Sequence, residues 1–193
     1  MDNYEKGGAS LRLHAMLPSS QANGPGLRWV LWLQGCNLAC PGCFNPETHP
    51  FNAGQRVEIS SLAKSILERQ DQIEGLSVSG GEPFYQAHAL AIFLEMIRQQ
   101  SQLSVLIFTG FSLSELSSIP AAPRVLEMTD VLIAGRYIQS RRVASGLIGS
   151  DNKKIHLLTN RYSQEDILSS FEAEVHIQTD GGILLTGIDP LQW

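Results

Sequence analysis

Residues 29–43 read Trp-Val-Leu-Trp-Leu-Gln-Gly-Cys-Asn-Leu-Ala-Cys-Pro-Gly-Cys, an apolar run that leads into the only three cysteines of the 193-residue chain. The run from Trp29 to Leu33 is almost continuously apolar, which is typical of a strand buried on both faces of a parallel sheet. The loop after it carries Cys36, Cys40 and Cys43. Three thiolates on one short loop can each bind one iron of a 4Fe–4S cluster, and the fourth iron then stays open to a small molecule. The stretch therefore predicts a buried strand that delivers an iron–sulfur site at its carboxyl end.

A disulfide framework and a structural zinc site have less support from these cysteines. A disulfide framework uses an even number of cysteines, and the first residues, Met1 to Lys6, lack the basic and apolar segments of a secretory signal. A structural zinc site needs a fourth ligand, for which His49 is a candidate, but zinc motifs typically pair their ligands in two separated groups. The spacing therefore favours a cluster, and reduced thiolate ligands indicate a cytoplasmic protein.

A second motif, Ser79-Gly-Gly-Glu-Pro-Phe84, lies between a short apolar segment, Leu76 to Val78, and a segment of helical periodicity, Gln86 to Arg98. Adjacent glycines at a strand end let the backbone approach a ligand closely. Glu82 adds an acceptor suited to an ammonium group, and Pro83 suits the first turn of a helix. Alone, the motif is typical of any strand-to-helix turn, so its weight comes from its occurrence together with the cysteine loop.

The remaining chain alternates between strand and helix patterns. Ser60 is a candidate N-cap for one helix, Ser112 and Glu115 form a candidate capping box for another, and Ser163 to Phe171 predicts a third. Further strands are predicted over residues 104–108, 130–134 and 154–158. Such alternation predicts a parallel sheet, whose ligand sites gather beyond the carboxyl ends of the strands. The cysteine loop, the glycine turn and Thr109-Gly110 all fall at that edge.

Together these residues resemble the radical S-adenosylmethionine (SAM) superfamily, and within it the organic-radical activating enzymes, especially those of anaerobic ribonucleotide reductase. The similarity is strongest from Asn23 to His49. Weaker matches follow in the same order at Thr109–Phe111, Asp130–Tyr137 and Gly149–Ile155, so the resemblance spans roughly residues 23–156.

The chain also departs from that family. Ala134 stands before the Gly135-Arg136 turn, where the family usually has an acidic residue. The pair Arg141-Arg142 and residues 174–193 go beyond a minimal activating enzyme. These departures bear on the substrate and leave the superfamily assignment intact.

The resemblance implies a cofactor site. Its metal ligands are Cys36, Cys40 and Cys43, and the amino and carboxylate groups of SAM would chelate the open iron. One-electron reduction would cleave SAM to methionine and a 5′-deoxyadenosyl radical, which abstracts hydrogen from a substrate. The expected contacts of SAM lie around the third cysteine and in the glycine turn: Gly42, Cys43, Phe44, Gly80, Gly81 and Glu82. Phe44 suits either an adenine contact or a core aromatic that steadies the loop. No individual catalytic residue is assigned.

The chain is short for an eight-fold barrel, and the resemblance implies the same limit. We therefore expect one domain over residues 1–193, with an α/β fold: a partial, open radical SAM β/α barrel with a mostly parallel sheet. The end of the chain differs, because Val175 to Leu185 reads as two strands around an Asp-Gly turn. This pattern predicts an antiparallel hairpin near the C-terminus.

Composition limits the partners. The net charge of −5 argues against general nucleic-acid binding, and no apolar run approaches the length that spans a membrane. The basic residues between Arg136 and Arg161 fit a partner-docking surface, a solvated loop or a set that stabilises the fold. Cluster reduction implies an external one-electron donor such as flavodoxin or ferredoxin.

Three functions remain open. The first is an activating enzyme that forms a glycyl radical on a partner protein, because an incomplete barrel leaves its site accessible to a large substrate. The second is a radical SAM enzyme that modifies a peptide or small molecule directly. The third is a non-catalytic iron–sulfur redox module, which the Gly-Gly-Glu-Pro turn argues against because an electron carrier needs no SAM site.

Overall fold

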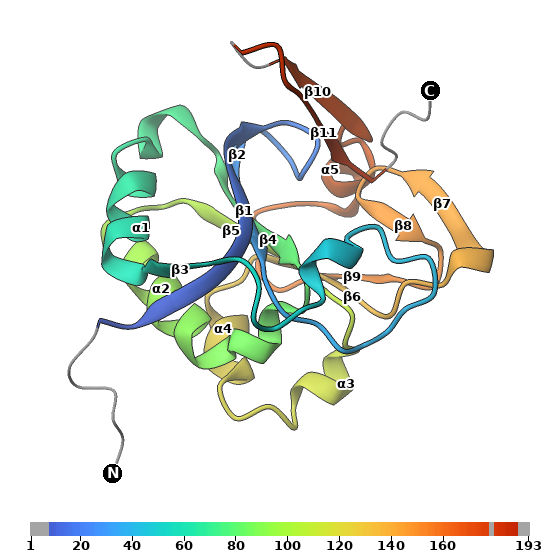
Figure 1. The fold of residues 1–193 in the computed structure, drawn as a ribbon, viewed down its shortest axis with the longest axis horizontal. Helices are drawn as coiled ribbons and strands as arrows, with labels where there is room; N and C mark the ends of the chain where they lie inside the picture. Colours follow the sequence, from blue (N-terminus) through green and yellow to red (C-terminus); the bar gives the residue numbers. More distant parts are fainter. Residues whose placement is uncertain (1–7, 178–179, 189–193) are drawn as a thin grey trace.

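The computed structural model describes residues 8–177 and 180–188 and contains a seven-stranded sheet of order β3-β1-β2-β4-β5-β6-β9 (Figure 1). The inner strands are β2 (Arg28–Leu33), β4 (Gly75–Gly80), β5 (Ser104–Thr109) and β6 (Val131–Ala134), and they run parallel. Antiparallel strands flank them: β1 (Ser10–Ser20), β3 (Gln55–Glu58) and β9 (Lys154–Leu157). The expected α/β fold with a parallel central sheet is confirmed, whereas β1 and β3 were not predicted.

Helices cover one face of this sheet. They are α1 (Ile59–Leu67), α2 (Ala87–Gln100) and α4 (Ala122–Glu127), which lie together in Figure 1. Alternation along the strands explains the packing, since Leu76 and Val78 of β4 join the large apolar core beneath the helices and Ser77 between them faces the other side. None of the described helices is long and apolar enough to cross a membrane.

Local capping signals were partly right. The capping box of Ser112 and Glu115 begins α3 (Leu113–Leu116), and Ser163 and Asp166 form a second box at α5 (Gln164–Leu168). The Ser60 cap was wrong, because β3 runs directly into α1 and Glu58 occupies the N-cap position. The helix predicted from Ser163 ends earlier than expected, at Leu168.

The other face of the sheet is covered by segments that follow β6. The hairpin of β7 (Arg142–Ser145) and β8 (Ile148–Ser150) and the helix α5 place Leu147 and Ile167 against Leu106, Val131 and Ile133. The sheet does not close on itself, so the open barrel expected from the sequence is confirmed. Short 3₁₀ turns complete the described elements: Pro46–Thr48, Gln70–Gln72, Pro83–Gln86 and Gln139–Arg141.

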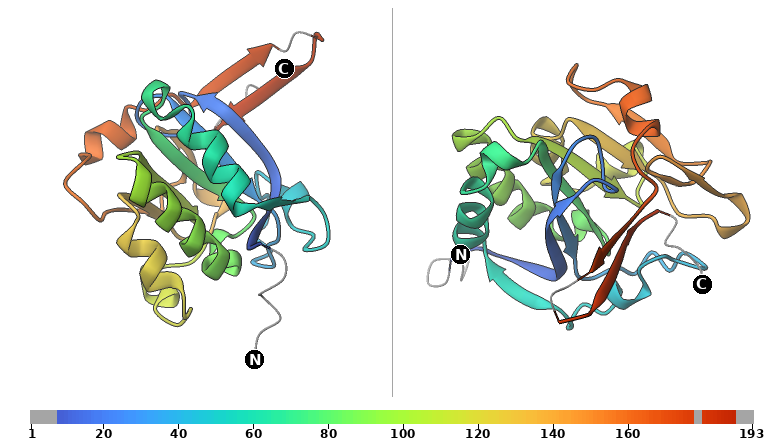
Figure 2. Two further views of the ribbon diagram at one scale, coloured as in Figure 1. Left: turned by 90° about the vertical axis from the view of Figure 1, so that its left-hand side faces the viewer. Right: turned by 90° about the horizontal axis from the view of Figure 1, so that it is seen from above.

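The expected C-terminal hairpin is present. Strands β10 (Ala173–Ile177) and β11 (Ile183–Gly187) pair antiparallel, while residues 178–179 of the connection lie outside the described residues. Figure 2 shows the hairpin standing away from α1 and α2.

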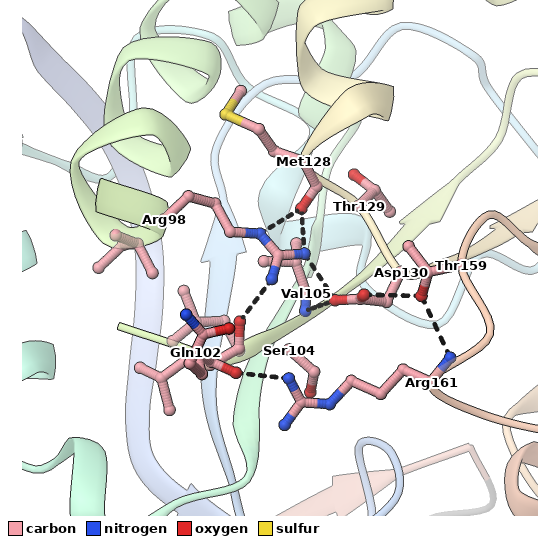
Figure 3. A network of polar contacts seen from close by, with 12 residues as sticks. Arg98, Gln102, Ser104, Val105, Met128, Thr129, Asp130, Thr159 and Arg161 are labelled. Atoms are coloured by element: carbon pink, nitrogen blue, oxygen red, sulfur yellow. Dashed lines mark hydrogen bonds and ion pairs between the residues drawn. The ribbon is translucent and has the colours of Figure 1, made fainter. Parts of the chain in front are cut away.

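Polar contacts join the strands at their amino ends. The Asp130 carboxylate accepts hydrogen bonds from the Val105 amide (2.8 Å), the Thr159 hydroxyl (2.8 Å) and the Arg98 guanidinium (2.7 Å), as Figure 3 shows. Arg98 also donates to the carbonyl oxygen of Met128 at 2.7 Å. This network fixes the amino ends of β5 and β6 to α2 and to the segment that follows β9.

Candidate iron–sulfur and cofactor site

The carboxyl ends of β2, β4 and β5 border one cavity of about 380 Å³. Its walls include the predicted cysteine loop, the glycine turn and the end of β5, which are far apart in the sequence. The structure thus brings these residues together: Cys36, Cys40, Cys43, Phe44, Gly80, Gly81, Thr109 and Gly110.

Backbone hydrogen bonds hold the cysteine loop in place. The Cys36 amide donates to the carbonyl oxygen of His49 (3.0 Å), and the amide of Gly35 donates to that of Thr48 (2.7 Å). Within the loop, the Cys43 amide donates to the carbonyl oxygen of Cys40 at 3.2 Å. The segment just after the cysteines therefore folds back and supports the loop that carries them.

The cysteine side chains suit metal binding. All three are free thiols and partly buried. Burial raises the pKa of Cys36 and of Cys43, and the neighbouring thiols raise it further. Coordination to a metal deprotonates such a thiol outright, so a cluster would relieve the cost of keeping these groups together as thiolates.

A 4Fe–4S cluster fits this donor set. Soft thiolates are the ligands that iron–sulfur clusters use, and each thiolate binds a different iron. Among the described residues, no three His, Cys, Asp or Glu side chains converge as they would around a single metal ion.

The two glycines of the turn are required by close packing. The amide of Gly81 donates to the carbonyl oxygen of Leu33 (2.8 Å), and a Cβ at Gly81 would come within 2.5 Å of the carbonyl oxygen of Gly35. Gly80 has a φ of 104°, a left-handed conformation that favours glycine. The turn thus packs directly against the start of the cysteine loop. The sequence predicted that these glycines let a ligand approach the backbone, and it did not predict this packing contact.

Glu82 connects the glycine turn to the end of β5. Its carboxylate is fully buried and accepts hydrogen bonds from the amides of Phe84 (3.0 Å) and Gly110 (2.7 Å) and from the Thr109 hydroxyl (2.8 Å). Burial raises its pKa despite these donors and the charge of Lys153. Both oxygens are thus engaged by the protein, so the carboxylate fixes the position of the Thr109-Gly110 backbone beside the cavity.

Phe44 lines the cavity, and its ring also packs against neighbouring side chains. Its ring contacts Tyr137, with centroids 4.5 Å apart, and the Arg142 guanidinium lies 5.1 Å from its centre. A Cβ at Gly149 would come within 2.7 Å of the ring. Gly42 is similarly confined, because a Cβ at this position would come within 2.7 Å of the Gln139 side chain.

Lys153 is a site residue that the sequence patterns did not reveal. Its side chain lines the cavity, and its ammonium group donates to the carbonyl oxygen of Gly135 at 2.6 Å. Burial lowers the pKa of Lys153, whereas Cys40, Glu82 and Cys43 act to raise it. Lys153 lies within the Gly149–Ile155 match, which was a usable signal, but in the sequence it was grouped only with the neighbouring basic residues.

Other members of that basic set form ion pairs. Arg136 pairs with Glu115 (3.1 Å), Arg141 with Asp151 (2.5 Å) and Arg161 with Glu74 (2.9 Å). Arg136 also donates to the carbonyl oxygen of Gly110 at the cavity rim. Much of the local basicity is therefore neutralised within the chain.

An open α/β barrel with three free thiols at the carboxyl ends of its strands defines an iron–sulfur protein. The family model described as "4Fe-4S single cluster domain" matches residues 22–156. The chain belongs to this family and to the organic-radical activating enzymes of the radical SAM superfamily, whose cofactors are a 4Fe–4S cluster and SAM.

Curated relatives named for radical activation support this placement. The anaerobic ribonucleoside-triphosphate reductase-activating proteins of Salmonella typhimurium and Vibrio cholerae are 30% and 32% identical, and each match covers 77% of this chain and 99% of the relative. A putative glycyl-radical enzyme activating enzyme of Haemophilus influenzae is 36% identical over 51% of this chain and 38% of its own length. The crystal structure of QueE from Escherichia coli aligns with a TM-score of 0.44 and 17% identity, over 55% of this chain and 56% of that one.

Proposed function

We propose that this chain is an activating enzyme that cleaves SAM reductively and forms a glycyl radical on a partner protein. The observation that carries the proposal is the shared cavity at the strand ends, where the three thiols, the glycine turn and Thr109-Gly110 meet. When bound, the cluster and SAM supply a 5′-deoxyadenosyl radical that removes hydrogen from the substrate. The protein supplies position and excludes water.

Each group of residues has a proposed part. Cys36, Cys40 and Cys43 hold the cluster. The backbone of Gly80 and Gly81 receives the methionyl end of SAM, and Glu82 acts there by holding the amide of Gly110 in place. The remaining proposed contacts flank the last cysteine: Gly42 and Phe44.

The proposed substrate is a backbone glycine of a partner protein. The relatives that match over nearly their whole length are named for anaerobic ribonucleoside-triphosphate reductase, so a reductase of this kind is the first partner to test. We further propose that the chain works as one domain in the cytoplasm, with flavodoxin or ferredoxin as electron donor.

A direct action on a peptide or small molecule is the second candidate. One observation favours it, because the C-terminal hairpin, which the family match does not include, forms part of the cavity wall. The departure at Ala134 adds little support, since this side chain is buried in the core beneath the helices.

Electron paramagnetic resonance separates these candidates. The reconstituted protein is incubated without oxygen with SAM, a reductant and the reductase from the same organism. A glycyl doublet that depends on SAM, followed by oxygen-induced cleavage of the reductase at one glycine, is expected. A reductase that stays radical-free while a peptide or metabolite is converted would replace the proposal with the second candidate.

A further inference from the structure

The hairpin β10–β11 presents its edge to the cavity. Five consecutive residues, Leu184 to Ile188, line the cavity with the cysteines, and no described residue of β10 does. A sheet face would contribute every second residue, and from both strands. Lining by consecutive residues of one strand is therefore the signature of a strand edge.

This edge lies outside the region that the family shares. The family match ends at residue 156, and the reductase-activating relatives align over 99% of their own length with only 77% of this chain. The edge of β11 thus lies outside the family match, whereas most of the other residues that line the cavity lie within it.

Buried polar contacts hold the hairpin in position. The Asn23 amide group donates to the hydroxyls of Thr186 and Ser20, each at 2.9 Å. The Glu174 carboxylate accepts from the Ser20 hydroxyl at 2.7 Å and from the amide of Gln21 at 3.0 Å. Ser20, Asn23 and Thr186 are all buried, so the hairpin is fixed to the end of β1.

The strand register shows which backbone groups point outward. The Ile188 amide donates to the carbonyl oxygen of Glu172 at 2.8 Å, and the pairing continues without a shift through Val175↔Leu185 and Ile177↔Ile183. Hydrogen-bonded and non-hydrogen-bonded pairs alternate in an antiparallel ladder. The N–H and C=O of Ile183, Leu185 and Gly187 therefore point away from β10. Among the described strands, β11 pairs with β10 alone.

We propose that the edge of β11 binds an extended segment of the substrate polypeptide as a third strand, and so carries the target glycine into the cavity. Outward donors and acceptors that repeat every second residue match a polypeptide backbone, and strand addition is an established mode of peptide recognition. Leu185 and Gly187 lie on this edge and in the cavity wall, so the added strand enters beside the thiols. The proposal rests on the proposed function and specifies how the partner is recognised.

A cross-strand pair supplies matched variants for the test. Leu185→Pro removes an outward N–H from the β11 edge that faces the cavity. Val175→Pro removes the outward N–H of its cross-strand partner, on the opposite, β10 edge of the hairpin. Proline is tolerated at such edge positions because the lost N–H has no partner within the hairpin. Melting temperatures of the two variants check that the cost to folding is the same.

The probe is a synthetic peptide that spans the radical-bearing glycine of the partner reductase, and its affinity is measured by fluorescence anisotropy. Leu185→Pro should weaken binding by about tenfold or more, and Val175→Pro should stay within about twofold of the wild type. Equal affinity of the two variants overturns the proposal.

A second measurement needs no variant of the enzyme. Peptides methylated at one backbone nitrogen at a time should lose affinity at every second position, because alternate amides of an added strand face β11. Loss without this alternation, or no binding of the peptide to the wild type, overturns strand addition. These assays do not depend on turnover, so alternating loss of affinity without any glycyl radical would support the edge site while refuting the proposed function.

Discussion

At the amino ends of the parallel strands, Arg28 is fully buried, and its guanidinium group is hydrogen-bonded to the surrounding protein. It donates to the carbonyl oxygen of Leu76 (2.6 Å) and to the hydroxyls of Ser77 (2.7 Å) and Ser104 (3.0 Å). At the carboxyl ends of the same strands the cysteine thiols border a cavity, and burial raises the pKa of Cys36 and Cys43.

The difference separates stability from chemistry. Buried polar groups that are fully hydrogen-bonded rigidify a structure, whereas groups left to face a cavity are available to a ligand. One end of the sheet therefore holds the strands together, and the other end can bind cofactors because its three cysteine thiols are free and face the cavity. In barrels of parallel strands, this division between the two ends is general.

The largest expected effect is the loss of the cluster. Replacing Cys36, Cys40 or Cys43 by Ala should abolish cluster binding and SAM cleavage, because the chain has only these three cysteines. The free energy of unfolding of the cluster-free protein should change by less than about 1 kcal/mol, since the thiols are only partly buried. Iron and sulfide analysis after anaerobic reconstitution checks the prediction.

Asn37→Ala is the control for these variants, because Asn37 lies in the same loop and carries no thiol. It should retain the cluster. Full cluster content in any of the cysteine variants would show that the loop does not hold the irons as proposed.

At the opposite end of the sheet, Arg28→Met should reduce stability and not cofactor binding. The substitution leaves the carbonyl oxygen of Leu76 and the hydroxyl of Ser104 without the donors that Arg28 provides. We expect a loss of about 3–5 kcal/mol in the free energy of unfolding. Urea denaturation measures it, with Arg56→Ala on exposed β3 as the control. A loss no larger than that of the control would refute the role of Arg28.

Asp130→Asn tests the same end with a smaller change. Burial acts to raise the pKa of Asp130, but hydrogen bonds from the Val105 amide and Thr159, together with Arg98, outweigh burial and lower it. A carboxyl whose pKa is lower in the folded state contributes stability above its unfolded pKa, and this contribution is lost as the pH falls. The wild type should exceed the variant by about 1–3 kcal/mol at neutral pH.

That advantage should shrink as the pH falls below the ordinary pKa of 3.8 and through the folded value. Urea denaturation of both cluster-free proteins across this range is the measurement. A difference that stays constant with pH would mean that the carboxylate charge is not what stabilises the network.

The sequence predicted the features that depend on residues close together in the chain. Trp29–Leu33 lies within β2, and the pairs Ser112/Glu115 and Ser163/Asp166 begin helices, because strand burial and capping depend on residues close in the chain. Strand β1 was missed because it is partly exposed and because one of its two partners, β3, lies far along the chain.

The sequence predicted where the site lies better than it predicted the contacts within the site. The rule that strand ends share an edge placed the cysteine loop beside the glycine turn. The same rule could not show that both oxygens of Glu82 face the protein or that Lys153 enters the cavity, since these contacts depend on how distant segments pack. The single-domain prediction and the roles of individual SAM contacts stay predictions.

The smallest expected effect comes from Glu82→Gln, and its pH dependence should have the opposite sign to that of Asp130. Burial raises the pKa of Glu82, so its contribution to stability is greatest below the unfolded pKa and is lost as the pH rises through the folded value. The stability of the wild type relative to the variant should therefore fall with rising pH. At neutral pH the two should differ by less than about 1 kcal/mol, because Gln loses one acceptor but avoids burial of a charge.

The variant also tests whether Glu82 acts on SAM through the backbone. Gln keeps the size of the side chain but offers one carbonyl oxygen where the carboxylate serves Phe84, Thr109 and Gly110 with two. SAM affinity, measured by equilibrium dialysis on the reconstituted protein, should fall by a few-fold, to about tenfold at most, while iron content is unchanged. A loss of affinity of many orders would instead point to direct contact between the carboxylate and SAM, since a shifted amide alone cannot cost that much. Unchanged affinity would limit Glu82 to stabilising the strand ends.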